Sequence, residues 1–288
     1  MLSNAVYEAL KSLVPESNLL LNEPLSRHTT FKVGGPADCF VEIEDAQQLK
    51  KVLGYLKAVG IPFFVMGNGS NILVSDKGVS GVILNLSDKI SRIEVSGNTI
   101  KAEAGARLTL VSRKACEAGL KGMEFAAGIP GCVGGAVCMN AGAYGGEMKQ
   151  VIKKVTCMSY DGELLEIDNE TMEFGYRTSA VKNRDFIVVE AEFSLEPGNR
   201  DEIKALMDDF NKRRRDKQPL EYPSAGSTFK RPEGYFAGEL IMKSGLAGER
   251  LGGATVSPKH CGLIVNDNKA TATDIKTLID KVKIKVKE

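Results

Sequence analysis

The sequence contains no tryptophan and only two histidines, His28 and His260, among its 288 residues. It has six cysteines but no Cys-x-x-Cys pair, so the residues favour neither a zinc site nor a disulfide framework, and buried thiols are expected. No stretch reaches about 18 unbroken apolar residues, and the N-terminus lacks the pattern of a signal peptide. We therefore expect a cytoplasmic protein with no metal site and no membrane partner.

An excess of charge of either sign is also missing, since 38 basic and 37 acidic side chains leave a net charge of +1. The composition therefore indicates no general affinity for nucleic acid or for a membrane surface. The one concentration of charge is residues 212–217, where five of six positions are cationic. This segment indicates either a solvated helix end or a rim that binds phosphate, and the lack of aromatic residues between the cations argues against nucleic-acid binding.

The chain length indicates about two domains, at roughly 100–200 residues per domain. The hydrophobic period changes repeatedly between helical and alternating, which is typical of an α+β protein. Asp45 predicts the start of a helix that ends near Gly60, and the break at residues 197–199 predicts a domain boundary at residue 198. Further strands are predicted at residues 61–66, 79–86, 93–95, 100–102, 154–160, 164–167, 186–195 and 262–265, and helices at 108–119, 201–215 and from about 273.

Two glycine-rich segments are candidate ligand-binding loops. Residues 67–71, GNGSN, directly follow a predicted strand, where backbone N–H groups can converge on an anion such as a diphosphate. Their spacing matches neither the Rossmann fingerprint nor a P-loop, and a plain tight turn is the alternative. Residues 126–146 are too rich in glycine for a regular element to be expected. Two such loops favour a large, nucleotide-like cofactor.

Six motifs occur in a fixed order along the chain. They are TTFKVGG at residues 29–35, GNGSN at 67–71, GIPG at 128–131, NAGAYG at 140–145, YR at 176–177 and SAGSTFK at 224–230. In this order and at these separations they resemble the bacterial UDP-N-acetylenolpyruvoylglucosamine reductases, over nearly the whole chain. The sequence has no insertion after Arg177, and in this respect it resembles the shorter subgroup of that family.

The resemblance implies a vanillyl-alcohol-oxidase-type FAD-binding domain followed by a smaller α/β substrate-binding domain. The first would span residues 1–198, in two subdomains divided near residue 78, and the second residues 199–288. FAD would be bound non-covalently, with NADPH as co-substrate. The residues implied in cofactor binding are Gly67, Asn68, Gly69, Ser70, Asn71, Gly128, Ile129, Pro130, Gly131 and Gly134.

The implied reaction is the reduction of UDP-N-acetylglucosamine enolpyruvate to UDP-N-acetylmuramate in peptidoglycan precursor synthesis. A hydride passes from reduced flavin to the vinyl carbon, and Ser227 then protonates the carbon beside the carboxylate. By residues alone, Arg177 is either a surface charge or a guanidinium fork for a carboxylate, and the resemblance implies the fork. The residues implied in binding the UDP-sugar are Tyr144, Tyr176, Lys217, Lys230 and His260.

The sequence departs from the family pattern at Arg231, where many relatives have an asparagine. The family also has a catalytic glutamate in a strand beyond the last helix, whereas this sequence ends inside that predicted helix. Because the helix carries no stop signal, we expect the natural chain to continue. Two other readings are an oxidase or dehydrogenase of the same flavin fold, and a flavin- or nucleotide-binding module without catalysis.

Overall fold

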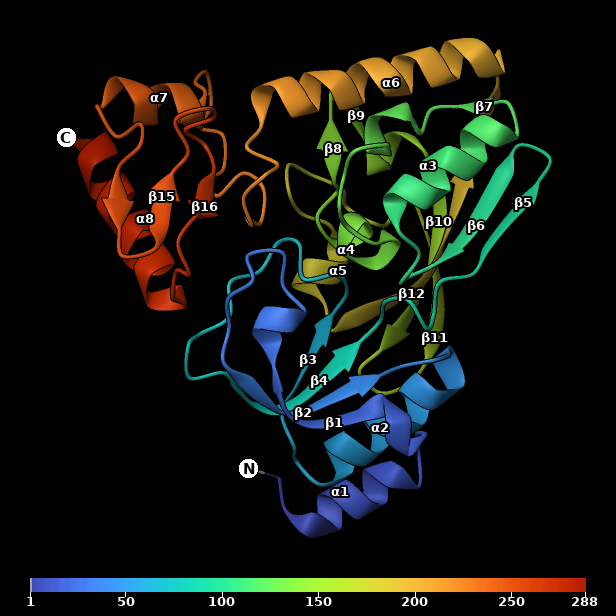
Figure 1. Cartoon of the computed structure of the whole chain (residues 1–288). Helices are drawn as coiled ribbons and strands as arrows, with labels where there is room; N and C mark the ends of the chain where they lie inside the picture. Colours follow the sequence, from blue (N-terminus) through green and yellow to red (C-terminus); the bar gives the residue numbers. More distant parts are fainter. Residues whose placement is uncertain (1) are drawn as a thin grey trace. The chain divides into compact units, whose positions relative to one another are not determined.

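The computed structural model describes residues 2–288, which form two compact units (Figure 1). The first unit comprises the N-terminal stretch to Leu21, Asp38–Asn68 and Gly81–Lys212. The second comprises Asn22–Ala37, Gly69–Ser80 and Arg213–Glu288. The predicted boundary at residue 198 divides the chain once, whereas these units interleave, because two short N-terminal segments pack with the C-terminal part.

A four-stranded sheet in the order β1-β2-β4-β3 carries two helices on one face (Figure 1). The Asp45 side chain caps the second helix by accepting the Gln48 N–H at 2.7 Å, which confirms the predicted helix start. The apolar stripe of that helix enters the main core at Leu49 and Leu53. The elements are α1 (Asn4–Lys11), β1 (Leu19–Pro24), β2 (Pro36–Glu42), α2 (Ala46–Ala58), β3 (Phe63–Met66) and β4 (Val79–Asn85).

A five-stranded antiparallel sheet in the order β11-β10-β12-β6-β5 completes the first unit's core. The strands predicted at residues 93–95 and 100–102 are confirmed and form a hairpin, with Ser96 paired to Thr99 across its turn. The strands are β5 (Ile93–Ser96), β6 (Thr99–Glu103), β10 (Ile152–Ser159), β11 (Leu164–Asp168) and β12 (Phe186–Ser194). Shorter elements are α3 (Leu108–Glu117), β7 (Leu120–Lys121), β8 (Gly142–Ala143), β9 (Gly146–Glu147), α5 (Ala180–Asn183), β13 (Glu196–Pro197) and the 3₁₀ turns Glu16–Asn18, Leu25–Arg27, Glu124–Ala126 and Met148–Gln150.

The expectation that residues 126–146 hold no regular element was wrong, because helix α4 (Val133–Cys138) lies within them. The packing of Gly134 shows why this segment forms a helix although it contains glycines. The Gly134 N–H donates to the Ala104 carbonyl at 2.8 Å, and a side chain there would meet the Ala104 methyl at 3.1 Å. Close packing against the end of β6 therefore outweighs the low helix propensity of glycine.

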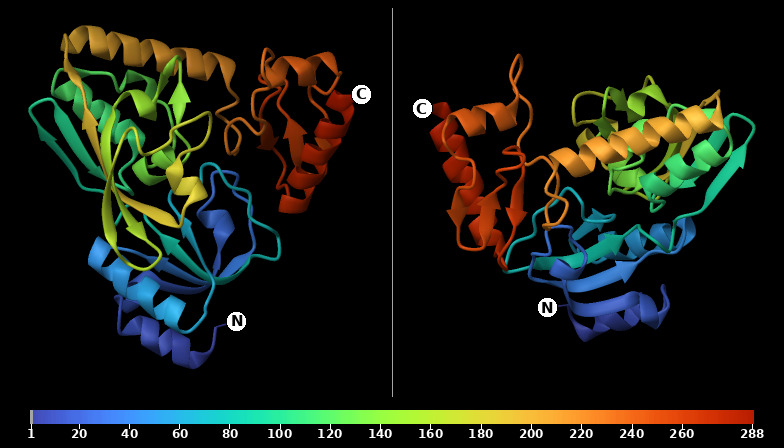
Figure 2. Two further views of the ribbon diagram at one scale, coloured as in Figure 1. Left: turned by 180° about the vertical axis from the view of Figure 1, so that it is seen from behind. Right: turned by 45° about the horizontal axis from the view of Figure 1, so that its top comes forward.

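Helix α6 (Arg200–Lys217) is drawn in Figure 2 as one long straight helix, with acidic residues in its first turn and basic residues in its last. The helix macrodipole stabilises acidic side chains near the N-terminus of a helix and basic side chains near its C-terminus. The last turn of α6, residues 213–217, belongs to the second unit. Along residues 2–288, no helix combines the length and the apolar character that crossing a membrane requires.

The second unit is built on a small antiparallel sheet, β14-β15-β16, against which the closing helix packs (Figure 2). The helix predicted from about residue 273 is confirmed, and its Ile275, Leu278 and Val282 are buried in this unit's core. A capping box between Thr271 and Asp274 begins the helix. The elements are α7 (Ala237–Lys243), β14 (Arg250–Leu251), β15 (Ala254–Val256), β16 (Ile264–Asn266) and α8 (Ala272–Lys287).

Candidate functional site

The two predicted cofactor loops meet in the first unit, where Gly67 lies against Cys132. A side chain at Gly67 would collide with the Cys132 sulfur, so only glycine allows this approach. The buried amide of Asn85 donates to the carbonyls of Met66 and Gly67 at 3.2 and 3.1 Å and fixes the end of β3. The structure thus brings Gly67 and Asn68 next to the loop of residues 128–134.

Backbone hydrogen bonds to neighbouring segments hold the loop of residues 128–134 in place. The Ile129 N–H donates to Ala126 O at 3.1 Å, and Gly131 O accepts the Leu108 N–H at 3.0 Å. The N–H of Gly134 is engaged with Ala104 O. This N–H is therefore not free to contact a cofactor.

The rest of the glycine turn, Gly69, Ser70 and Asn71, belongs to the second unit. Gly69 has φ = +58°, and its carbonyl accepts the Thr30 N–H at 3.1 Å. The TTFKVGG segment thereby supports the turn, and Asn266 of β16 in turn holds that segment by donating to Phe31 O at 3.0 Å. The first and fifth residues of GNGSN thus lie in different packing units.

Arg177 lies in a tight turn with φ = +57°, in which Gly175 and Thr178 bond to each other's backbone. Its guanidinium donates to Asn140 O at 3.4 Å and to Gly142 O at 3.3 Å. It also lies 5.4 Å from the centre of the half-exposed Tyr176 ring. The fork is therefore oriented by two backbone carbonyls.

Tyr144 lies between β8 and β9 with φ = +53°, on the same hairpin that holds Arg177. Its ring stacks on Phe210 of α6, with centroids 4.5 Å apart and planes 9° apart. Tyr144, Tyr176 and Arg177 are thus brought together in the first unit. Sequence reasoning missed Phe210, although a lone aromatic residue in a strongly charged helix was a signal for it.

Ser227, Lys217 and His260 lie on adjoining segments of the second unit. Ser227 forms a bridge with Leu263, and the Thr228 N–H donates to Gly262 O at 2.9 Å. The turn that carries His260 is tied to the last turn of α6, because Lys259 Nζ donates to Arg215 O at 2.7 Å. Lys217 ends that helix, and Lys230 is exposed just after the Ser227 loop.

Arg231, the departure from the family pattern, is engaged within its own loop. Its Nε donates to Tyr235 O at 3.3 Å, and its guanidinium carbon lies 3.9 Å from the centre of the Phe236 ring. A cation over an aromatic face at this distance is stabilised by the ring quadrupole. Arg231 therefore orders residues 231–236.

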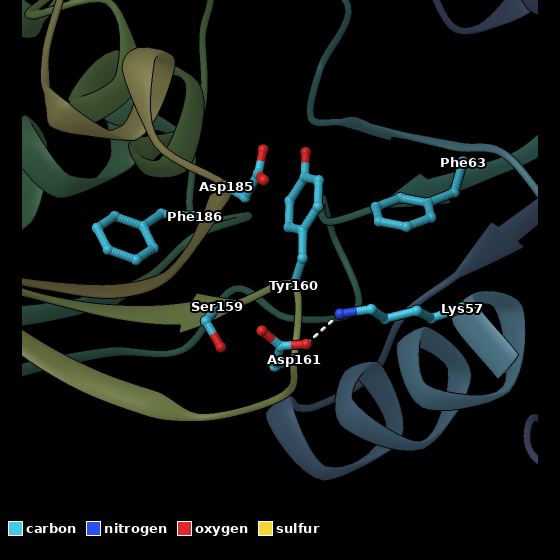
Figure 3. A pocket seen from close by; sticks show the side chains of 7 residues that line it. All are labelled: Lys57, Phe63, Ser159, Tyr160, Asp161, Asp185 and Phe186. Carbon is cyan, nitrogen blue, oxygen red and sulfur yellow. Dashed lines mark hydrogen bonds and ion pairs between the residues drawn. The ribbon is translucent and has the colours of Figure 1, made fainter.

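A separate cavity of about 390 Å³ in the first unit contains none of the predicted site residues (Figure 3). It lies beside an ion pair between Lys57 and Asp161, and Phe63 packs on Tyr160 at a ring distance of 5.0 Å. Burial raises the pKa of Tyr160, and the nearby Asp185 carboxylate raises that pKa further. The remaining lining residues are Ser159 and Phe186.

The thiols and carboxylates of residues 2–288 form no group of three or more suited to a metal ion. All six cysteines are free, and Cys138 alone among them is half-buried while the others are buried. The prediction of buried, unbridged thiols is therefore confirmed for five of the six.

Comparison with known proteins identifies two family regions. Residues 37–168 match an FAD binding domain, and residues 218–288 match the UDP-N-acetylenolpyruvoylglucosamine reductase C-terminal domain. Both agree with the predicted α+β fold, an FAD-binding domain followed by a substrate domain. The crystal structure of the reductase from Thermus caldophilus has a TM-score of 0.81 and 36% identity, covering 92% of this chain and 94% of that one. Phl p 4, a glucose dehydrogenase, shares the fold alone, with a TM-score of 0.53 and 14% identity over 68% of this chain and 45% of its own.

Curated sequences extend the similarity over the full length. The UDP-N-acetylenolpyruvoylglucosamine reductase of Clostridioides difficile is 48% identical over 96% of this chain and 91% of its own length. The reductase of Caldanaerobacter subterraneus is 48% identical over 100% of this chain and 95% of its own length. With both family regions present in order, the chain belongs to the UDP-N-acetylenolpyruvoylglucosamine reductase family, whose first domain binds FAD.

Proposed function

We propose that this protein uses NADPH and FAD to reduce UDP-N-acetylglucosamine enolpyruvate to UDP-N-acetylmuramate, in the cytoplasm. The observation that carries the proposal is the guanidinium fork of Arg177, oriented by two backbone carbonyls inside a chain of the reductase family. A planar, permanently charged fork suits the carboxylate of an enolpyruvyl group better than a lysine does.

The glycine loops fit a flat, anionic cofactor. Gly67 lies against the Cys132 side chain of the loop of residues 128–134, so these two glycine-rich segments are neighbours. Their glycine backbone can approach a diphosphate and an aromatic ring closely, because it carries no side chains. Residues 67–71 and 128–131 would hold the cofactor, together with Gly134. Bound there, FAD would supply two-electron chemistry, which would carry a hydride equivalent from NADPH to the substrate.

Arg177 supports the negative charge that develops on the substrate carboxylate. When a hydride equivalent adds to the terminal vinyl carbon, the π-electron pair shifts toward the carboxylate, which then carries nearly two negative charges. A guanidinium already held in place stabilises this charge without reorganising, and removing such a donor typically costs about 10²–10³-fold in rate. Its remaining N–H groups are available for that contact, since five are present and two are used by carbonyls.

Ser227 completes the reduction by donating a proton to the carbon beside the carboxylate. The electron pair held there forms the new C–H bond, and the serine oxygen recovers its proton from solvent. The Ser227 side chain is exposed in its unit while its backbone is bridged to Leu263, so the hydroxyl is presented from an ordered segment. A positioned acid of this kind is worth about 10²–10⁴-fold.

The remaining predicted residues bind the UDP-sugar. Tyr144 and Tyr176 offer exposed aromatic faces, of which Tyr144 is fixed by stacking on Phe210. Lys217 and Lys230 offer ammonium groups for the diphosphate, and His260 contributes a polar contact from the turn next to the end of α6.

The test is an anaerobic titration of the purified yellow protein. NADPH should bleach the flavin band, and UDP-N-acetylglucosamine enolpyruvate should restore it in a one-to-one ratio, with a product heavier by two hydrogens. Acid precipitation should release all the flavin, because the binding is non-covalent. A protein that binds no FAD, or whose reduced flavin is unchanged by the enolpyruvyl sugar, contradicts the proposal.

A further inference from the structure

Asn140 connects the two segments that orient Arg177. Its side chain is buried, with 1% of its surface exposed, and makes hydrogen bonds in both directions. Its Nδ2 donates to Gly175 O at 3.1 Å, in the turn that carries Arg177, and its Oδ1 accepts the Lys149 N–H at 2.9 Å, beyond β9. The carboxamide thus joins the arginine turn to the hairpin that carries Tyr144.

The backbone of Asn140 adds a third connection. Its carbonyl oxygen accepts an N–H of Arg177 at 3.4 Å, next to the Gly142 carbonyl that accepts another. Asn140 has φ = +40°, a left-handed conformation that asparagine tolerates better than most residues. Asn140 therefore supports Arg177 in two ways from one left-handed conformation. Its backbone carbonyl accepts the guanidinium N–H, and its side-chain amide holds the turn that carries Arg177.

We infer that Asn140 is the positioning residue for Arg177. It contacts no substrate in this role; it sets the direction in which the guanidinium presents its remaining N–H groups. This inference rests on the proposed function, because it assumes that Arg177 stabilises the charge on the substrate carboxylate. A displacement of about 1 Å in such a group can cost 10²-fold in rate, and loss of an orienting contact typically costs about 10–100-fold.

Two variants separate the contacts of the side chain. Asn140→Asp keeps the side-chain shape and the acceptor for the Lys149 N–H. It replaces the donor to Gly175 O by a carboxylate oxygen, which repels that carbonyl oxygen. Asn140→Gly keeps the left-handed backbone without strain and removes both side-chain bonds. In each, we expect the reoxidation of reduced flavin by the enolpyruvyl sugar to slow about 10–100-fold, with flavin reduction by NADPH within about twofold of wild type.

The matched control is Asn169→Asp. Asn169 donates to Lys149 O at 2.8 Å and to Ile152 O at 2.6 Å, so it anchors the same Met148–Gln150 turn without reaching Gly175 or Arg177. A purely structural effect of loosening that turn would appear in this variant too. We expect its reoxidation rate to match that of wild type.

A double-variant comparison tests whether Asn140 acts through Arg177. In an Arg177→Ala background, Asn140→Asp should slow reoxidation no further, because the group that it positions is gone. An additional 10-fold loss in that background, or equal slowing of both half-reactions, would overturn the inference. So would wild-type reoxidation in both Asn140 variants. Failure of the wild-type protein to be reoxidised by the sugar would instead refute the proposed function.

Discussion

Gly67, at the end of β3, lies directly against the sulfur of Cys132, with no room for a methyl group between them. This contact brings together two glycine-rich segments that are far apart in the sequence. Both residues pack in the first unit, and Cys132 is 2% exposed, so the sulfur has little freedom to move aside. The glycine at this position therefore sets the spacing of the proposed cofactor loops.

Gly67→Ala should separate these loops and weaken FAD binding. Overpacking of this kind costs about 1–3 kcal/mol, and we expect the Kd for FAD to rise at least 10-fold, measured by flavin fluorescence during reconstitution. Gly54→Ala is the control, since Gly54 lies in α2 with no atom near an added methyl group, and alanine there should stabilise the helix by about 0.5–1 kcal/mol. Unchanged FAD affinity in Gly67→Ala would show that the loops tolerate a wider spacing.

Ser227→Ala should leave flavin reduction by NADPH almost unchanged while overall turnover falls about 10²–10⁴-fold, because only the second half-reaction needs the proton. Stopped-flow absorbance at the flavin band measures the two halves separately. Ser244→Ala, which removes a hydroxyl bonded to Leu240 O within α7, serves as the control with normal turnover. Equal slowing of both halves would remove Ser227 from its assigned role.

Arg177→Lys should slow the second half-reaction about 10²–10³-fold. A lysine cannot both donate to the two backbone carbonyls and present a planar fork to the substrate carboxylate. Thermal unfolding should stay within about 2 °C of wild type because the side chain is partly exposed. Arg184→Ala is the control. Arg184 forms an exposed ion pair with Glu173, eleven residues earlier in the chain, and loss of this pair should leave the rates of both half-reactions unchanged. A large drop in melting temperature in Arg177→Lys would point to unfolding instead.

Local signals predicted many elements of this fold, but they missed helix α4 and the long-range pairings. The cap at Asp45 and the hairpin at residues 96–99 depend on a few neighbouring residues, so the sequence contains them. The interleaving of the two units depends on contacts such as that of Phe31 with Asn266, which no local pattern encodes. Likewise, the motifs identified Arg177 and Tyr144, whereas the stacking of Tyr144 on Phe210 required the packing of α6.

Asp76 should contribute to stability at neutral pH and lose that contribution in acid. Its carboxylate accepts the Thr273 hydroxyl at 2.6 Å and the N–H groups of Ala272 and Thr273, at the start of α8. The hydroxyl bond is the main reason that the pKa of Asp76 is lowered, with the backbone bonds adding to it. Asp76→Ala should therefore lower the free energy of unfolding by about 1 kcal/mol at pH 7.

The sign of the pH dependence follows from the lowered pKa. Above the unfolded-state pKa of about 3.9 the contribution is complete, and it is lost as the pH falls below this value toward the folded-state pKa. Urea unfolding of wild type and Asp76→Ala at pH 7 and at pH 3 measures the difference, which should shrink at pH 3. Asp216→Asn, at an exposed position in the last turn of α6, should cause no loss at either pH. A difference that grows in acid would contradict this account of Asp76.

Cys157 and Cys39 should resist alkylation in the native protein. Burial raises the pKa of the Cys157 thiol to about 12, and burial with the nearby Asp38 charge raises that of Cys39 to about 11. At pH 8, a thiol with a pKa of 12 is ionised in about one molecule in ten thousand, and the thiolate is the reactive form. Iodoacetamide followed by peptide mapping should label the half-buried Cys138 first, and Cys138→Ser should abolish that fast phase. Rapid labelling of Cys157 under native conditions would mean that the sheet around β10 opens far more often than its packing in the main core indicates.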